Sequence, residues 1–188
     1  NMTAKEKIWS SLFQAVAPRT AGFNSVDLSL VSEPGQLMTI VLMLIGGAPG
    51  STAGGMKMTT IAVLFLAMFS TFRRKEDVNC FGRRITENVI KNAAAILLMY
   101  LSLFLIGAFV ISCVEGLPLQ TCLFETASAI GTVGLSLGIT SQVGPLSHII
   151  LMVLMFLGRV GGLTLIFAMG SGPRANLSKL PQEKITVG

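Results

Sequence analysis

Two short turns in the sequence share the pattern Thr-x-Gly and could bind a cation through their backbone. They are Thr20, Ala21, Gly22 and Phe23, and Thr132, Val133, Gly134 and Leu135. Glycine permits a positive φ angle, which allows successive carbonyl oxygens to point the same way. A row of carbonyl oxygens can replace the water shell of a dehydrated K⁺ ion. We therefore predict a selectivity filter that binds K⁺ through backbone carbonyls near Gly22 and Gly134, with equivalent roles for the two glycines.

A segment rich in Gly, Ser and Thr, residues 46–55, interrupts an apolar region over residues 34–72. Gly and Pro at this density break a helix. Irregular backbone survives at membrane depth only where it packs on protein or lines a cavity. The spacing of Gly50 and Gly55 is that of a nucleotide-binding P-loop, but Met56 stands where that motif needs Lys. We predict a gating loop instead, and its residues are Gly46, Gly47, Gly50, Ser51, Thr52, Gly54, Gly55 and Lys57.

Arg159 is the single Lys, Arg, Asp or Glu in an apolar run over residues 146–169. A charge at the centre of a bilayer costs at least about 2.5–3.5 kcal/mol on insertion scales. The guanidinium must therefore face a cavity, a carboxylate or backbone carbonyls. Two roles fit this requirement and stay open at this point. The charge could line a pore and repel cations, or it could cap the carbonyl ends of the broken helix.

The elements that would position these groups are the helices of a membrane protein. The chain has 188 residues and a mean hydropathy of +0.72, and 12% of its residues are charged, against about 25% in soluble domains. Residues 89–114 and 146–169 are long and apolar enough to cross a bilayer. We therefore predict an all-α membrane protein. The composition excludes a disordered chain, and the net charge of +5 without interleaved aromatic residues indicates no nucleic-acid partner.

Shorter helices are expected next to both turns and on both sides of the gating loop. Residues 5–16 and 117–130 are too short to cross a bilayer, and each leads into a Thr-x-Gly turn, as a pore helix does. Residues 36–45 and 56–72 would be half-helices joined by the loop. The alternative for this region is a loop outside the membrane between two short helices.

The two turns lie 112 residues apart (132 minus 20), and the same offset aligns Gly46 and Gly47 with Gly158 and Arg159. This weak internal repeat predicts two helix–pore loop–helix units, as in two-transmembrane potassium channels. The first unit covers residues 1–72 and has a broken second helix. A linker over 73–88, a second unit over 89–170 and a tail over 171–188 follow. Because the first unit lacks its leading helix, we expect an earlier part of the protein to be absent.

Basic residues are concentrated in residues 73–91 and in the tail, which predicts that both are cytoplasmic in a multi-pass cell membrane protein. The three cysteines have neither the number nor the spacing of a disulfide framework or a zinc site. No Ser/His/Asp or Cys/His set suggests catalysis. The sequence therefore favours a membrane protein that is not an enzyme.

The motifs together resemble the TrkH/KtrB superfamily of cation transporters, and KtrB more than TrkH itself. The residues that carry the resemblance are 17–24, 46–57, 131–136 and 158–161. The resemblance implies four helix–pore loop–helix repeats around one central pore, of which this chain holds the third and fourth. It also implies K⁺ uptake, often with Na⁺ dependence, a homodimer, and a cytoplasmic ring of nucleotide-binding RCK subunits of the KtrA type, without an organic cofactor. The alternative is a non-conducting membrane scaffold or assembly subunit, which would have no use for two carbonyl turns.

Overall fold

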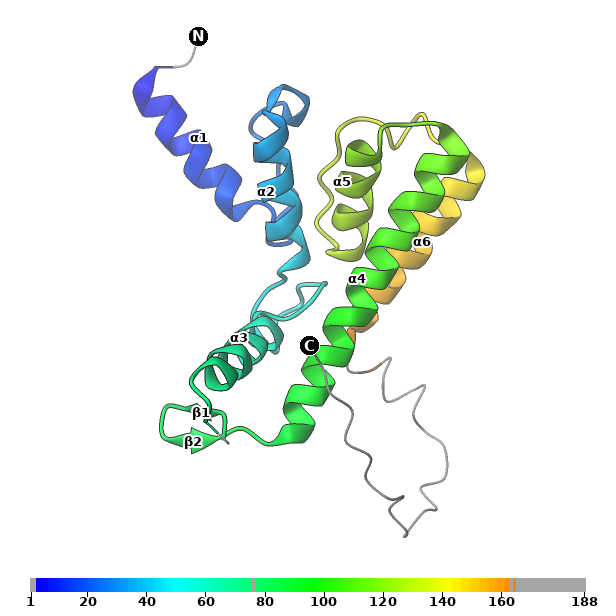
Figure 1. Cartoon of the computed structure of the whole chain (residues 1–188). Coiled ribbons are helices and arrows are strands. Elements are labelled where there is room, and N and C mark those ends of the chain that lie inside the picture. Colours follow the sequence, from blue (N-terminus) through cyan, green and yellow to red (C-terminus); the bar gives the residue numbers. More distant parts are fainter. Residues whose placement is uncertain (1–2, 76, 163, 165–188) are drawn as a thin grey trace.

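The computed structural model describes residues 3–75, 77–162 and 164 of the chain. Helices dominate this part, and a short two-stranded hairpin interrupts them (Figure 1). In chain order the elements are α1 (Ala4–Val16), the 3₁₀ helix η1 (Leu28–Leu30), α2 (Glu33–Leu44), α3 (Met58–Phe72), β1 (Asn79–Cys80), β2 (Arg83–Arg84), α4 (Glu87–Glu115), α5 (Leu119–Ile130) and α6 (Pro145–Val160).

Local signals explain where several helices begin and end. Thr3 and Glu6 form a capping box on α1, in which the Glu6 carboxylate accepts from the Thr3 N–H at 2.8 Å. Pro34 and Pro145 lie in the first turns of α2 and α6, where proline loses no helical hydrogen bond. Gly116 ends α4 in the left-handed conformation, with φ 67°. These signals are local, so the sequence alone places the elements closely.

Helix α4 is the one helix in the described part of the chain that is both long and apolar enough to cross a membrane. It has 29 residues, and an 18-residue stretch within it has a mean hydropathy of 2.6. The apolar helices α3 and α6 are shorter. Helix α6 ends at Val160, and the next residue, Gly161, has a φ of 87°. The predicted span over 146–169 is therefore helical to residue 160, and most of its remainder lies outside the described residues.

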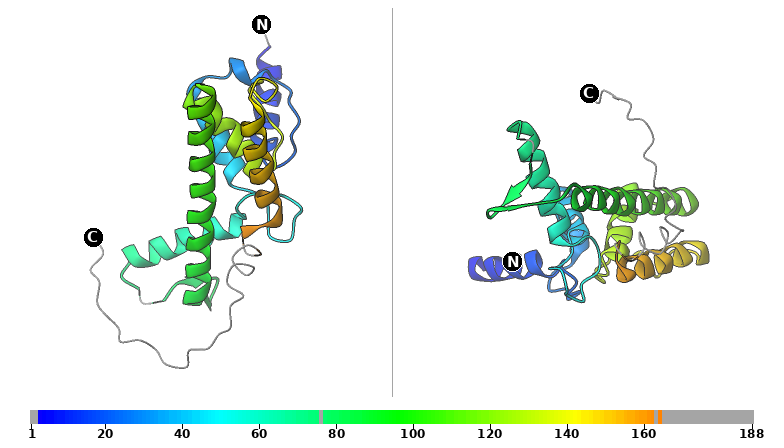
Figure 2. Two further views of the ribbon diagram at one scale, coloured as in Figure 1. Left: turned by 90° about the vertical axis from the view of Figure 1, so that its right-hand side faces the viewer. Right: turned by 90° about the horizontal axis from the view of Figure 1, so that it is seen from below.

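Helix α5 lies at the centre of the packing. It contacts α2, α4 and α6, and its side chains at Cys122, Phe124, Ala127 and Ile130 are fully buried. Helix α4 packs along α5 and α6 and also contacts α3 (Figure 2). Gly107 allows α4 and α6 to approach closely, because a Cβ there would lie 2.9 Å from Leu154 Cδ1. Among the described helices, the short helix before the second turn is thus the most enclosed.

The apolar region over 34–72 is broken, and its two halves do not continue one another. Helix α2 ends at Leu44 and α3 begins at Met58, compared with predicted halves over 36–45 and 56–72. Ile45 and Met56 form an isolated parallel bridge, and the Gly46 N–H donates to the Met56 carbonyl at 2.7 Å. Helix α3 then runs across the direction of α4 (Figure 2). The bridge closes the base of the loop, so the intervening residues project from it.

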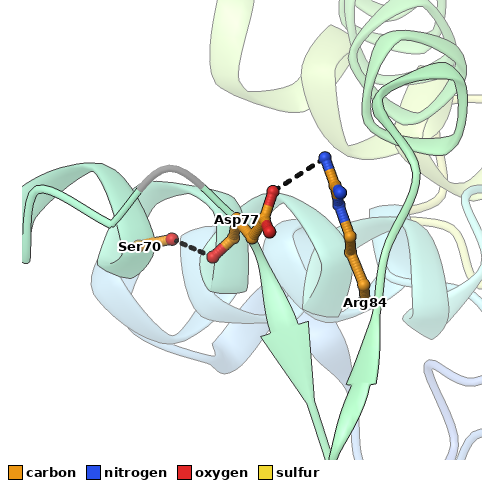
Figure 3. Close-up of polar contacts among 3 residues, drawn as sticks. All are labelled: Ser70, Asp77 and Arg84. Carbon is orange, nitrogen blue, oxygen red and sulfur yellow. Dashed lines mark hydrogen bonds and ion pairs between the residues drawn. The ribbon is translucent and has the colours of Figure 1, made fainter.

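The basic segment that we treated as a linker contains a β-hairpin. Strands β1 and β2 are joined by Phe81 and Gly82, both with positive φ (47° and 76°), as a tight hairpin turn requires. The Ser70 hydroxyl donates to the Asp77 carbonyl at 2.9 Å, and Arg84 pairs with the Asp77 carboxylate at 2.8 Å (Figure 3). These contacts tie the hairpin to the end of α3. The turn was missed because phenylalanine rarely adopts a positive φ.

Glu115 joins the end of α4 to the start of α6. Its Oε1 accepts from the Gly144 N–H at 2.8 Å and from the hydroxyl of the fully buried Ser147 at 2.5 Å. A carboxylate at a helix N-terminus is also favoured by the helix dipole. This contact holds the C-terminal end of α4 against the N-terminal end of α6.

Replacing Glu115 with Ala should lower the Tm of the protein in detergent by several degrees, because two donors lose their acceptor. Thermal unfolding of the purified protein measures this. Glu87→Ala is the matched control, because Glu87 lies at the other end of α4 in an exposed ion pair with Lys91. An equal or larger loss of Tm in the control variant would contradict the assigned role of Glu115.

Candidate functional site

The two Thr-x-Gly turns have the same unusual backbone. Thr20 and Gly22 have φ angles of 63° and 69°, and Thr132 and Gly134 have 53° and 88°. The residue between each pair does not have a positive φ. Threonine seldom adopts a positive φ. Its positive φ at equivalent places in both turns therefore indicates that the two turns share one backbone conformation. The alternation gives each turn a backbone on which successive carbonyls can face one side.

The two turns also lie against each other. A Cβ on Gly22 would lie 2.5 Å from the Val133 carbonyl oxygen, and a Cβ on Gly134 would lie 4.0 Å from the Gly22 Cα. The two turns therefore meet, although they are far apart in the chain. The contact is not symmetric, because a Cβ on Gly22 would collide with Val133, whereas a Cβ on Gly134 would make only an ordinary van der Waals contact with Gly22. The predicted equivalence of the two glycines does not hold in their surroundings.

The residues that we predicted to form a gating loop divide into a buried base and an exposed tip. Gly54 and Gly55 are buried, whereas residues 48–52 are exposed. The Gly54 N–H donates to the Thr132 Oγ1 at 3.1 Å, and a Cβ on Gly54 would collide with the Thr132 side chain. The base of the loop is thus in direct contact with the second turn. In Figure 1 the loop lies beneath the lower end of α5.

Two cationic side chains hold three consecutive carbonyls in the loop. Arg159 donates to the Thr52 carbonyl at 2.5 Å. The Lys57 ammonium donates to the Ala53 carbonyl at 2.5 Å and to the Ser51 carbonyl at 3.3 Å. The partner of Arg159 therefore lies in the loop itself, whereas the capping role that we considered placed it at the carbonyl end of a helix.

Two cavities lie beside Arg159, one at the second turn and one at the loop. One of about 490 Å³ lies along the second turn, and one of about 330 Å³ lies at the loop. Arg159 lines both of them. The larger cavity is lined by the second turn and Arg159. Glu125, Ser136 and Thr140 also line it. The guanidinium thus shares a cavity with the second turn and also borders the loop.

Not every predicted site residue reaches this place. None of the four predicted filter residues of the first turn, Thr20, Ala21, Gly22 and Phe23, lines the larger cavity, and the Phe23 side chain is 70% exposed. Gly50, at the tip of the loop, has a φ of 82° with open space around it. The link from Thr132 to the loop is a contact that we did not foresee. Its only signal in the sequence is a hydroxyl group in an apolar chain.

Comparison with known proteins identifies the family. The model of the TrkH family, described as cation transport proteins, matches residues 1–180. The chain belongs to the TrkH family. This TrkH-family chain is 37% identical to the Ktr system potassium uptake protein B of Bacillus subtilis (strain 168), over 97% of its own length and 41% of that protein. It is 36% identical to the potassium/sodium uptake protein NtpJ of Enterococcus hirae, over 99% of its own length and 43% of that protein.

The fold of this chain is also similar to that of a solved structure. The potassium transporter TrkH from Vibrio parahaemolyticus matches with a TM-score of 0.78 and 22% identity, covering 92% of this chain and 39% of that chain. The TrkH-family chain therefore spans about two-fifths of the length of the relatives it matches. The predicted resemblance to the TrkH/KtrB superfamily is confirmed, and the relatives are membrane cation transporters, not enzymes.

Proposed function

We propose that this chain supplies two of the four helix–pore loop–helix repeats around the central pore of a potassium uptake system. The observation that carries the proposal is the contact between two turns with matching positive φ angles at Thr20, Gly22, Thr132 and Gly134. Two adjacent turns supply half of a four-fold ring of carbonyls, and α1 and α5 serve as their pore helices. The remaining repeats complete the ring, whether they lie on the same chain or on another. We call that complete unit the assembled transporter.

K⁺ is the transported cation in this proposal, and uptake depends on Na⁺. Relatives named for potassium uptake and for potassium/sodium uptake support this choice. The assembled transporter forms a homodimer in the lipid bilayer of the cell membrane. Its cytoplasmic side carries residues 73–91, the tail and a KtrA-type ring of nucleotide-binding RCK subunits. The basic residues of the hairpin segment support this orientation, whereas residues 171–188 lie outside the described part.

We further propose that residues 46–55 form a gate that crosses the path beneath the filter. The hydrogen bond from Gly54 to Thr132 supports this place for the loop. Lys57 and Arg159 hold its carbonyls in the closed position. Opening then requires these bonds to break, and the cytoplasmic ring biases the balance between the two positions.

A non-conducting scaffold is the second candidate function. It would account for the helices and for the membrane location. It would not account for the positive φ of two threonines in matching turns that touch each other. Conduction is therefore the function that the geometry favours.

Rubidium uptake into liposomes that contain the assembled transporter tests the proposed function. A K⁺-loaded vesicle in a low-K⁺ medium that contains Na⁺ should accumulate ⁸⁶Rb⁺, and external K⁺ should compete. Protein-free liposomes provide the background. Uptake at background level, from protein that elutes as a single folded species, would favour the scaffold.

Replacing Arg159 with Ala should raise K⁺ flux by roughly 10- to 100-fold, because it removes both a positive charge and a bond that holds the gate. Repulsion between unit charges about 6 Å apart is about 3 kcal/mol at an effective dielectric of about 20. The change should appear as faster ⁸⁶Rb⁺ uptake at equal protein density. Arg159→Lys keeps the charge and should remain close to the parent. Unchanged flux together with a lower Tm would leave Arg159 with a purely structural role.

A further inference from the structure

Glu125 is a buried carboxylate in α5, the helix that leads into the second turn. Its side chain is 5% exposed, and its neighbours Phe124, Thr126 and Ala127 are also buried. Burying a carboxylate is costly unless hydrogen bonds replace its lost water. The position of Glu125 therefore depends on the donors around it.

All of its donors come from one segment, which leaves the second turn on the other side. Oε1 accepts from the Ser136 hydroxyl at 2.5 Å and from the Leu137 N–H at 3.1 Å, and Oε2 accepts from the Thr140 hydroxyl at 2.9 Å. Ser136 also accepts from the Gly138 N–H at 2.9 Å. Glu125 thus bridges the chain that enters the turn and the chain that leaves it.

The first turn has no equivalent bridge. At the offset of 112 residues, Phe13 occupies the position of Glu125, and Asn24 and Leu28 occupy those of Ser136 and Thr140. Phe13 is 44% exposed and Leu28 is 2% exposed, so neither side chain could replace a carboxylate or a hydroxyl. The carboxylate bridge belongs to the second turn alone.

The backbone of the second turn is strained. Thr132 holds a φ of 53°, as Thr20 does at 63° in the first turn, and a Cβ on Gly134 would meet only the Gly22 Cα, at 4.0 Å. Such strain persists only where the surrounding contacts over-determine it. Selectivity in a carbonyl filter depends on the number, spacing and field strength of its oxygens. A turn released from Glu125 could move inward around the smaller Na⁺ ion.

Building on the proposed function, we propose that Glu125 is a positioning residue that sets the K⁺/Na⁺ selectivity of the second turn. It does not touch the ion. It acts through hydrogen bonds to Ser136, Leu137 and Thr140, which fix the carbonyls of residues 132–135. Selectivity is therefore unequally distributed between the two turns of this chain, and the second turn owes its share to one buried side chain.

Two substitutions at Glu125 in the assembled transporter distinguish the effect of its hydrogen bonds on selectivity from the effect of its side-chain volume. Glu125→Met keeps the length but removes every acceptor, and we expect the K⁺/Na⁺ permeability ratio to fall by at least about tenfold at near-parental abundance. Glu125→Gln keeps an oxygen for the Leu137 N–H, and its amide can donate to Thr140. This variant should retain most of the ratio. The ratio is read from reversal potentials or from competing ⁸⁶Rb⁺ and ²²Na⁺ uptake.

Thr126→Val is the matched control. Thr126 is a fully buried polar residue of the same helix, and its hydroxyl bonds to the Cys122 and Leu123 carbonyls rather than to residues 136–140. The K⁺/Na⁺ permeability ratio of this variant should equal that of the parent. If the Met variant does not fold, the double variant Ser136→Ala, Thr140→Val removes both hydroxyl donors from the opposite side and should give the same loss.

The outcomes distinguish this inference from the proposed function. A parent without ⁸⁶Rb⁺ uptake would overturn the proposed function itself. A selective parent with an equally selective Met or double variant would overturn only the positioning role of Glu125. A Gln variant as unselective as the Met variant would also overturn it, because the charge and not the hydrogen bonds would then decide selectivity.

Discussion

Deletion of residues 49–53 should raise K⁺ flux through the assembled transporter by at least about tenfold at equal membrane abundance, which corresponds to a barrier lower by about 1.4 kcal/mol. The deletion removes the carbonyls of Ser51, Thr52 and Ala53, which bond to Lys57 and Arg159. Flux should also lose its response to nucleotide on the cytoplasmic ring. Uptake of ⁸⁶Rb⁺ with and without nucleotide measures both effects.

The shortened loop can still close without distorting its flanking helices. Ile45 and Met56 already form a parallel bridge, and such neighbours lie only about 5 Å apart. The five residues left between them span at most about 18 Å, so the chain is long enough to rejoin. The bond from Gly54 to Thr132 lies outside the deletion.

The control for this deletion replaces residues 49–53 with five glycines. It keeps the length of the loop and the backbone carbonyls that Lys57 and Arg159 bind, so its flux should stay near that of the parent. Flux at or below the parental level in the deletion variant, with an intact nucleotide response, would show that the loop is a packing element and that the gate lies elsewhere.

Gly22→Ala should abolish K⁺ selectivity or prevent the two turns from packing. Gly22 has a φ of 69°, and its new Cβ would meet the Val133 carbonyl oxygen, which belongs to the other turn. A left-handed φ alone costs about 1–2 kcal/mol for a residue with a Cβ. Gly134→Ala carries only this strain, because its nearest neighbour lies 4.0 Å away. We expect a clearly smaller loss of K⁺/Na⁺ discrimination at Gly134.

Gly50→Ala is the control for strain alone. Its φ is 82°, nothing lies within 4 Å of its Cβ position, and it lies in the exposed tip of the loop, away from both turns. Its selectivity should match that of the parent in competing ⁸⁶Rb⁺ and ²²Na⁺ uptake. Equal effects of Ala at Gly22 and Gly134 would contradict the asymmetric contact between the turns.

Local chemistry allowed much of the architecture to be predicted from the sequence. The apolar length of α4, the prolines that begin α2 and α6, and the glycines that interrupt residues 34–72 act within a few residues of themselves. A helix needs only such short-range signals to begin, continue or end. The same locality made Gly22 and Gly134 visible as turn residues, because a positive φ is a property of one residue.

The relations between these elements were decided by the tertiary structure. Arg159 bonds to Thr52, which is 107 residues away, and Gly54 bonds to Thr132, which is 78 residues away. The sequence left two roles open for Arg159 and predicted no role for the Thr132 side chain. The offset of 112 residues aligned Arg159 with the start of the loop, but which carbonyl the guanidinium reaches depends on how α6 packs beside the loop.

The asymmetry of the two turns has the same origin. In sequence Gly22 and Gly134 are equivalent members of a repeat, but only Gly22 is packed against the carbonyl of the other turn. From the sequence, Glu125 could bond to the backbone near the second turn or be exposed. The packing of α5 among α2, α4 and α6 buries it against Ser136 and Thr140. Local sequence thus determined which segments could bind a cation, and the packing of distant helices determined which side chains hold those segments in place.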